Sequence, residues 1–423
     1  TSSLVASALG AWILFGPASA ATWGGIGSVL GYSFGTAFPM IALIYLGKKI
    51  RKEFPAGITF TQFIFYKIGK KLFKSILLLS IFYMFIFLCA EVTAVAMLMN
   101  YISNVSLWIT ATILLTATLI YTLYGGLRAS IFTDRFQFLI IIILLLVCVN
   151  GVFSSDLNFY QEIKKNSSNL FSSKYIPNYT AGLTFFIAVA ATNLFHQGNW
   201  QRVFAAKNYN VLRKSLKISF FIIFPLVFFM GLTGIIAVSI NNEINPDLAF
   251  FFILLEDKSK LLYIIVIILA VSLTASTIDT LVNAISSLIV VDGQKISKKL
   301  KSPNILLIFL SFIALFIASK GFSILYLFLL ADLLCCAAVF PIFYSFYKKN
   351  LKESYLIISI LTGLLLGLLF FPSPDFSKSI LIGILLPFDL FPQIISSSLL
   401  FVSFLLATLG PVIVIITYDS FKR

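Results

Sequence analysis

The sequence predicts an all-α membrane protein with about twelve transmembrane helices. Of its 423 residues, 60% are hydrophobic and only 11% are charged, whereas a soluble domain has about 25% charged residues. The mean hydropathy is +1.02. The apolar stretches are continuous and about 18–25 residues long, which indicates spanning helices and not the alternating strands of a membrane barrel.

The predicted spans follow these apolar stretches in chain order. They cover residues 2–22, 26–47, 74–102, 106–124, 129–152, 180–198, 213–239, 261–291, 303–319, 322–347, 354–372 and 395–418. The third and eighth are long enough to be tilted in a bilayer. Because the sequence starts at Thr1 without Met and its first residues already belong to a span, we expect the true N-terminus of the protein to be missing.

Residues 378–390 are apolar but short, and the stretch ends close to Pro387, Asp389 and Pro392. We expect a re-entrant or extracellular loop here, which leaves both termini of the chain in the cytoplasm. The alternative is a further span, which would place the basic C-terminal residues outside.

The basic residues predict the orientation of the chain. The net charge is +15, and Lys and Arg collect in the loops after the second, fourth, sixth, eighth and tenth spans; examples are Lys48, Arg128, Arg202, Lys298 and Lys348. Short loops rich in Lys and Arg face the cytoplasm. The charge therefore reports orientation in a plasma (inner) membrane, with lipid as the surrounding partner, and gives no reason to expect nucleic-acid binding.

Four acidic residues lie inside predicted spans, Glu91, Asp134, Asp279 and Asp332. A carboxylate at the centre of a bilayer costs at least about 2.5–3.5 kcal/mol, so it normally faces a polar, protein-lined cavity. No predicted span interior holds a Lys or Arg to neutralise these acids. The sequence therefore predicts a polar interior that binds cations.

The first span combines small residues with a Gly16-Pro17 step. Such a step weakens a helix and removes a backbone donor. In transporters, broken helices of this kind present free carbonyl groups to a coupling ion. The alternative is a proline kink whose small residues permit close helix packing.

The span 261–291 carries the richest set of oxygen-bearing side chains. At helical spacing one face holds Ser272, Ser276, Asp279, Thr280 and Asn283. Hydroxyl and carboxylate oxygens suit a hard cation such as sodium. The alternative is a stripe of back-bonded hydroxyls that joins neighbouring helices.

The end of the span 180–198 supplies candidates for a solute pocket: His196, Gln197 and Trp200. The alternative is a belt of polar and aromatic groups at the membrane interface. His196 is the only histidine, so a transition-metal site is not expected. Glu91 and Asp332 are further pocket candidates, with a structural hydrogen bond as the alternative for each.

The segment that joins the fourth and fifth spans contains Gly125 and Gly126, and we expect a tight turn there. It lacks the spacing of a nucleotide-binding loop. Asp134 follows this turn, where Arg128 or Arg135 could pair with it.

Three segments resemble the sodium:solute symporter family. Tyr124 to Gln137 contains G-G-L-x-A-x-x-x-T-D-x-x-Q, Gln201 to Lys207 contains Q-R-x-x-A-A-K, and Ser276 to Asp292 carries paired hydroxyls and ends in Asp. Members of this family carry solutes such as proline, sugars, pantothenate and urea. With the number of spans, the likeness covers nearly the whole chain.

The resemblance implies a leucine-transporter-type fold with a five-plus-five inverted repeat. Its halves would be 1–152 and 180–347, with 354–418 forming two peripheral helices. Many family members have one helix before this core, so the resemblance also implies a further N-terminal helix. It also implies a sodium site formed by the backbone carbonyls of Ala6, Leu9 and Leu273 and the hydroxyls of Ser276 and Thr277. Asp134 matches an acidic residue linked in some members to a second sodium site.

Two features depart from the family pattern. Asp279 is an extra acid that could serve a second cation or the coupling step. Sugar carriers place polar residues where this chain has Trp12, Ile13 and Leu14, so a sugar is not the expected solute.

The sequence thus predicts sodium-coupled symport of a small polar organic solute, such as an amino acid, an amine or a urea-like molecule. Buried acids without basic partners favour a cationic or zwitterionic solute and disfavour an anion. The alternative is a transporter-like sensor that acts with a separate signalling partner. An enzyme is not expected, because no nucleophile and base accompany the single histidine.

Overall fold

The computed structural model describes residues 10–55, 57–153, 158–255, 260–296, 304–348, 351–385 and 398–421, and for most of 121–138 it describes the backbone alone. Helices dominate these ranges, which contain a single isolated bridge, between Pro372 and Ser379, and no strand. The predicted all-α class is confirmed. The longer helices are α2 (Trp12–Glu53), α4 (Lys70–Ser103), α5 (Leu107–Phe153), α7 (Ile176–Phe195), α9 (Tyr209–Ile240), α11 (Lys260–Ser287), α12 (Asn304–Ser319), α13 (Ile324–Ser345), α14 (Glu353–Phe370) and α17 (Leu399–Phe421).

Short helices connect the longer ones. They are α3 (Phe60–Lys67), α6 (Phe159–Asn166), η1 (Ser168–Phe171), α8 (Gln197–Ala205), η2 (Pro246–Leu248), α10 (Ala249–Leu255), η3 (Leu288–Asp292), η4 (Gly293–Lys295) and α15 (Ile380–Leu385). The sequence analysis did not predict α3, α6 or α10 as helices. The six residues of α15 are too few to span a bilayer, as expected for this stretch; 386–390 lie outside the described residues.

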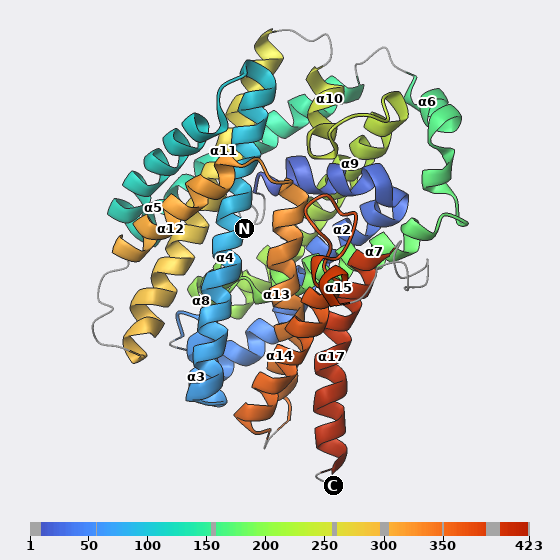
Figure 1. Cartoon of the computed structure of the whole chain (residues 1–423). Coiled ribbons are helices and arrows are strands. Elements are labelled where there is room, and N and C mark those ends of the chain that lie inside the picture. Colours follow the sequence, from blue (N-terminus) through green and yellow to red (C-terminus); the bar gives the residue numbers. More distant parts are fainter. Residues whose placement is uncertain are drawn as a thin grey trace.

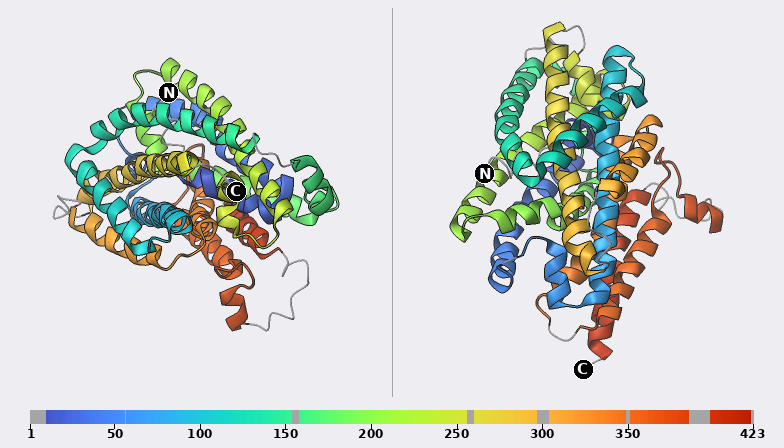
Figure 2. Two further views of the ribbon diagram at one scale, coloured as in Figure 1. Left: turned by 90° about the horizontal axis from the view of Figure 1, so that it is seen from above. Right: turned by 90° about the vertical axis from the view of Figure 1, so that its left-hand side faces the viewer.

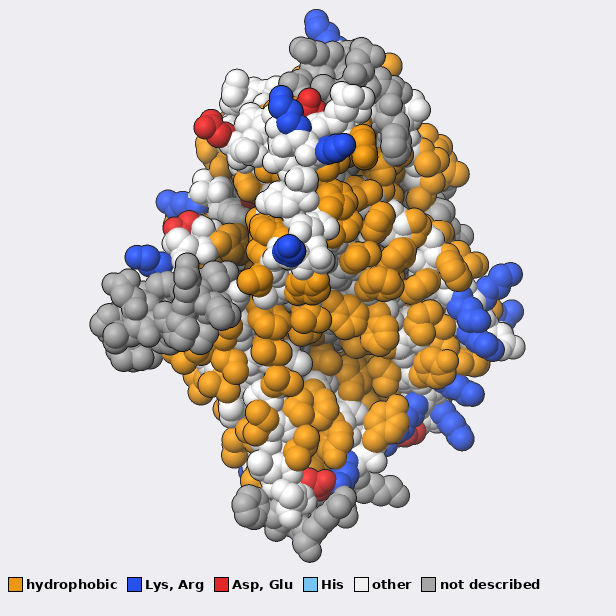
Figure 3. Space-filling view, turned by 90° about the vertical axis from the view of Figure 1, so that its right-hand side faces the viewer, with side chains coloured by type: hydrophobic (Ala, Val, Ile, Leu, Met, Phe, Trp, Pro, Cys, Tyr) orange, Lys and Arg blue, Asp and Glu red, His pale blue; other side chains and the backbone are white. Residues whose placement is uncertain are grey.

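Seven helices of the described chain are long and apolar enough to cross a membrane. Figure 3 shows a wide hydrophobic area over the middle of one face, with most charged side chains toward its margins. In Figure 1 the C-terminus and α3 lie at one end of the bundle, and α6 and α10 lie toward the other. This arrangement is that of a polytopic membrane protein.

Three of the five basic loops predicted to share one side of the membrane do meet. Arg51 donates to the carbonyl of Ala206 at 2.7 Å, and Lys49 donates to the carbonyl of Phe346 at 3.0 Å. These two bonds join the loops that follow α2, α8 and α13. The fold therefore places these three basic segments next to one another, at the same end of the bundle.

Helix α2 reverses direction at Gly25, where φ is +57° and ψ is −156°. This backbone conformation is essentially restricted to glycine. Beyond the reversal, the ring of Tyr32 stacks on Trp12 with centroids 5.9 Å apart. The part of the predicted span 2–22 that lies in α2 and the predicted span 26–47 are thus the two arms of α2, and residues 2–9 lie outside the described residues.

Of the two interpretations of the Gly16-Pro17 step, the structure supports the one without a helix break, because α2 continues through both residues. A Cβ at Gly16 would lie 2.5 Å from the Tyr32 hydroxyl oxygen. The small residue permits close packing of the two arms, as the alternative reading stated.

The predicted turn at Gly125 and Gly126 was wrong. Helix α5 continues from Leu107 to Phe153 without interruption and replaces two predicted spans. At about 1.5 Å per residue, a helix of 47 residues is about 70 Å long, which exceeds the thickness of a bilayer. Figure 2 shows that this helix runs around the outside of the bundle.

At each end of the helical core, a buried aspartate joins separate helices by hydrogen bonds. Near η2, Asp247 accepts hydrogen bonds from the backbone of Ile324 (2.8 Å) and Leu325 (3.4 Å), at the N-terminus of α13, and from Ser19 of α2 (3.0 Å). Burial raises the pKa of Asp247 above its ordinary value. At the other end, Asp292 accepts hydrogen bonds from Thr59 and Thr61, both at 2.6 Å, and so holds α3 against the end of α11.

Candidate functional site

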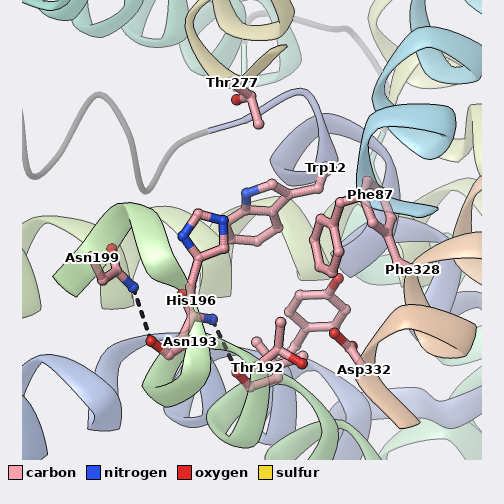
Figure 4. A pocket seen from close by; sticks show the side chains of 11 residues that line it. Trp12, Phe87, Thr192, Asn193, His196, Asn199, Thr277, Phe328 and Asp332 are labelled. Carbon is pink, nitrogen blue, oxygen red and sulfur yellow. Dashed lines mark hydrogen bonds between the residues drawn. The ribbon is translucent and has the colours of Figure 1, made fainter. Parts of the chain in front are cut away.

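A pocket lies among α2, α4, α7, α8, α11 and α13, close to the start of α2. Its described walls are formed by Trp12, Tyr32, Phe87, Val189, Thr192, Asn193, His196, Asn199, Thr277, Phe328 and Asp332. Figure 4 shows Thr277 and Asp332 far apart in the view, with Trp12 and His196 between them. The pocket therefore brings together residues from both halves of the sequence.

Aromatic rings form much of the wall. Trp12 and Tyr32 stack with centroids 5.9 Å apart, and Phe87 and Phe328 lie 5.2 Å apart. Asp332 is the one acidic residue among the eleven lining residues, which include no Lys or Arg. Aromatic faces and a carboxylate both attract a cation.

The break between α7 and α8 supplies the polar side of the pocket. His196 has extended backbone angles, φ −60° and ψ 116°, so the predicted span 180–198 ends there and a new helix begins. Asn199 of α8 donates to the backbone carbonyl of Asn193 at 2.9 Å, as drawn in Figure 4. This bond ties the start of α8 to the end of α7, and the Asn193 amide is held separately, by donating to the backbone carbonyl of Val189 at 2.9 Å.

Three residues of the predicted sodium site lie on α11. Leu273 and Ser276 are fully buried, and Thr277 is 7% exposed and lines the pocket. The Thr277 hydroxyl donates to the carbonyl of Leu273 at 3.1 Å. Ala6 and Leu9 lie outside the described residues.

Glu91, a predicted pocket residue, does not line this pocket. It is fully buried on α4, and its carboxylate accepts hydrogen bonds from the backbone N–H groups of Ala11 (3.0 Å) and Trp12 (3.4 Å). It therefore caps the N-terminus of α2, which has no cap from its own side chains.

Gln197 and Trp200 also lie outside the pocket wall. Gln197 accepts a hydrogen bond from the backbone of Phe60 at 3.1 Å, and Trp200 stacks on the Phe60 ring with centroids 4.7 Å apart. Trp200 is fully buried and donates to the carbonyl of Leu194 at 2.8 Å. Both residues hold α3 against α8, and neither belongs to an interfacial belt.

The predicted second cation position involves Asp279 and Asp134. Asp279 is fully buried on α11, and the Asp134 side chain lies outside those described. Arg202 of α8 is only 6% exposed and donates to Thr280, the residue after Asp279, at 3.3 Å. The sequence placed Arg202 in the basic loop after the span 180–198, and this was wrong, because α8 brings its side chain into the interior beside this part of α11.

Sequence reasoning missed the aromatic wall. Tyr32, Phe87 and Phe328 lie in apolar stretches with no local mark of function. One signal was available: Phe87 lies four residues before Glu91, and Phe328 lies four residues before Asp332. Residues four apart share a helix face, so each buried acid has an aromatic neighbour on its own face.

Comparisons with known proteins agree with this architecture. The chain is 28% identical over 348 residues to the spermidine transporter DUR31 of Candida albicans, covering 81% of this chain and 66% of that relative. The chain therefore spans just under two thirds of the relative's length.

Two solved structures share the fold. A sodium-coupled sialic acid symporter, solved in a substrate-bound outward-open state, matches with a TM-score of 0.71 and 14% identity, over 98% of this chain and 87% of that chain. Mhp1, a nucleobase-cation-symport-1 family transporter in a closed conformation with bromovinylhydantoin bound, matches with a TM-score of 0.55 and 14% identity, over 98% and 92%.

The family model of the sodium:solute symporters matches residues 1–363, most of the chain. The resemblance seen in the three sequence segments is thus confirmed, and the relatives named above are transporters and not enzymes. This chain belongs to the sodium:solute symporter family.

Proposed function

We propose that this protein couples the entry of sodium to the import of a small organic amine, by alternating access. The observation that carries the choice of solute is the pocket wall itself. Asp332 lies among Trp12, Tyr32, Phe87 and Phe328, and no Lys or Arg lines the described wall.

Electrostatics favours a cation over an anion in this pocket. Asp332 is 4% exposed, so water screens its charge poorly and an anion would be repelled. An ammonium group could bind the carboxylate and contact an aromatic face, which contributes about 0.5–2 kcal/mol when desolvated. The spermidine transporter named above supports an amine, since its name gives a polycationic amine as its cargo.

Sodium coupling is supported by the position of Thr277. Its side chain lines the solute pocket, and it is also one of the two hydroxyl residues of the predicted sodium site. An ion bound at Ser276 and Thr277 would lie beside the solute, and each would alter the affinity for the other. Sodium is thus cargo, with Ala6, Leu9 and Leu273 as the further proposed ligands.

Uptake by purified protein in proteoliposomes tests the proposal. We expect an inward sodium gradient to drive uptake of spermidine or a simpler amine well above uptake in a matched potassium gradient. Amino acids and urea, the other solute classes expected from the sequence, serve as competitors. Uptake that is equal in sodium and potassium would contradict the proposal.

Removal of the paired hydroxyls tests the ion site. We expect Ser276→Ala with Thr277→Ala to raise the sodium concentration needed for half-maximal uptake at least about tenfold, because two ion ligands are lost. Thr417→Ala with Ser420→Ala is a matched control, since these two hydroxyls bond to the backbone of α17 on an exposed surface. If the double variant at Ser276 and Thr277 kept the sodium dependence of the wild-type protein, these two hydroxyls would not be ligands of the ion.

A further inference from the structure

The start of α2 is held by a charged group from another helix. The N–H groups of Ala11 and Trp12 donate to the two carboxylate oxygens of Glu91, at 3.0 and 3.4 Å. A negative group is favourable at this position, because a helix N-terminus carries about half a positive charge. Because the helix N-terminus carries about half a positive charge, capping neutralises only about half of the negative charge of the Glu91 carboxylate.

The same carboxylate faces the hydroxyl of Thr277. A Cβ built on Gly10 would lie 2.5 Å from Glu91 Oε1 and 2.6 Å from Thr277 Oγ1. Two oxygens from α4 and α11 therefore converge on one point beside the backbone of residue 10. Thr277 is also a residue of the proposed sodium site, so the carboxylate borders that site.

Glu91 has the chemical capacity for a cation. A carboxylate offers about four acceptor positions, and backbone N–H groups of α2 use two of them. The side chain is fully buried, and the salt bridges found among the described residues do not include it. A buried carboxylate is stable when a cation pairs with it.

We propose that Glu91 is a ligand of the coupling sodium ion, with Oε1 beside Thr277 Oγ1, so that the ion site carries a formal negative charge. This inference rests on the proposed function. It also gives the ion a direct effect on the solute pocket, because the carboxylate that holds sodium also holds the backbone of Trp12, whose ring lines the pocket.

Sodium-dependent thermal stabilisation of the purified protein tests this proposal. The midpoint is recorded against sodium chloride, with potassium chloride keeping the ionic strength constant, and the shift gives an apparent sodium Kd. We expect Glu91→Gln to raise this Kd at least about tenfold. The glutamine oxygen still accepts a backbone hydrogen bond, so the variant removes the charge and keeps part of the cap.

Asp247→Asn is the matched control. Asp247 is also a buried carboxylate that accepts two backbone N–H bonds at a helix N-terminus, that of α13. We expect this variant to lower the baseline midpoint and to leave the sodium Kd unchanged. If Glu91→Gln behaves in the same way, Glu91 is only a cap and the proposal is overturned.

A second variant, Glu91→Asp, tests the proposal if Glu91→Gln does not fold. Glu91→Asp keeps the charge but moves it back by one methylene, so we expect weaker sodium binding that remains measurable. An unchanged sodium Kd in Glu91→Asp would contradict the proposal. A wild-type protein that sodium does not stabilise would instead contradict the proposed function, so the two failures are distinguishable.

Discussion

Thr277 is the residue at which the proposed ion and solute sites meet. It lines the pocket, its hydroxyl bonds to Leu273 one turn earlier, and the same oxygen faces Glu91 across Gly10. A side chain at residue 10 would collide with both oxygens, which explains the glycine there. Coupling at this site thus requires no long path through the protein.

Asp332 provides the test of solute chemistry at the residue scale. We expect Asp332→Asn to raise the KM for the transported amine at least about tenfold, because an ammonium loses its charged partner in a poorly screened pocket. Radiolabelled uptake measures this change. The sodium Kd without solute should stay the same, and a variant with wild-type KM would exclude Asp332 from solute binding.

The sequence identified the charged residues of the site more readily than its shape. Asp332 and His196 were predicted as pocket residues from their chemistry, Thr277 was implied as a sodium ligand by the family resemblance, and all three line the pocket. Glu91 was found as a buried acid, but its bonds to Ala11 and Trp12 join residues 80 and 79 positions apart. No local pattern predicts such a pairing, because it depends on how α4 packs against the start of α2.

At the scale of elements, one break and one reversal create the site. The reversal at Gly25 returns Tyr32 to Trp12, and the break at His196 turns α8 away from α7. The sequence predicted a boundary between residues 22 and 26 and left open a helix break or a packed proline kink at Gly16-Pro17. Pro17 is tolerated inside α2, so proline alone did not locate the interruption.

Gly25 gives a stability prediction for α2. We expect Gly25→Ala to destabilise the protein by at least about 3 kcal/mol. The backbone conformation alone costs about 1–3 kcal/mol for other residues, and a Cβ would lie 2.4 Å from both Asn178 Oδ1 and the carbonyl oxygen of Leu170. Thermal or denaturant unfolding in detergent measures the change.

Gly151→Ala is the control for that prediction. Gly151 lies within α5, and a Cβ there would come no closer than 3.1 Å to a neighbour, the flexible end of Leu254. We expect this substitution to be neutral or stabilising, since alanine favours a helix by about 1 kcal/mol over glycine. If Gly25→Ala and Gly151→Ala were equally stable, the reversal of α2 would not require a glycine at residue 25.

At the scale of the whole molecule, composition and charge were sufficient to predict the class. The low content of charged residues predicted a helical membrane bundle, and the basic loops after α2, α8 and α13 do meet at one end. The course of α5 was not predictable in this way. Its two apolar stretches read as two spans, yet the backbone stays helical through Gly125 and Gly126.

In the proposed mechanism, sodium and an amine bind in adjoining sites that share Thr277. Equilibrium binding of the transported amine, measured by calorimetry in sodium and in potassium, tests this most directly. We predict that the amine binds about 5- to 150-fold more tightly in sodium, and that the amine tightens sodium binding by the same factor. Tight binding of the amine with one Kd in both salts would contradict the account.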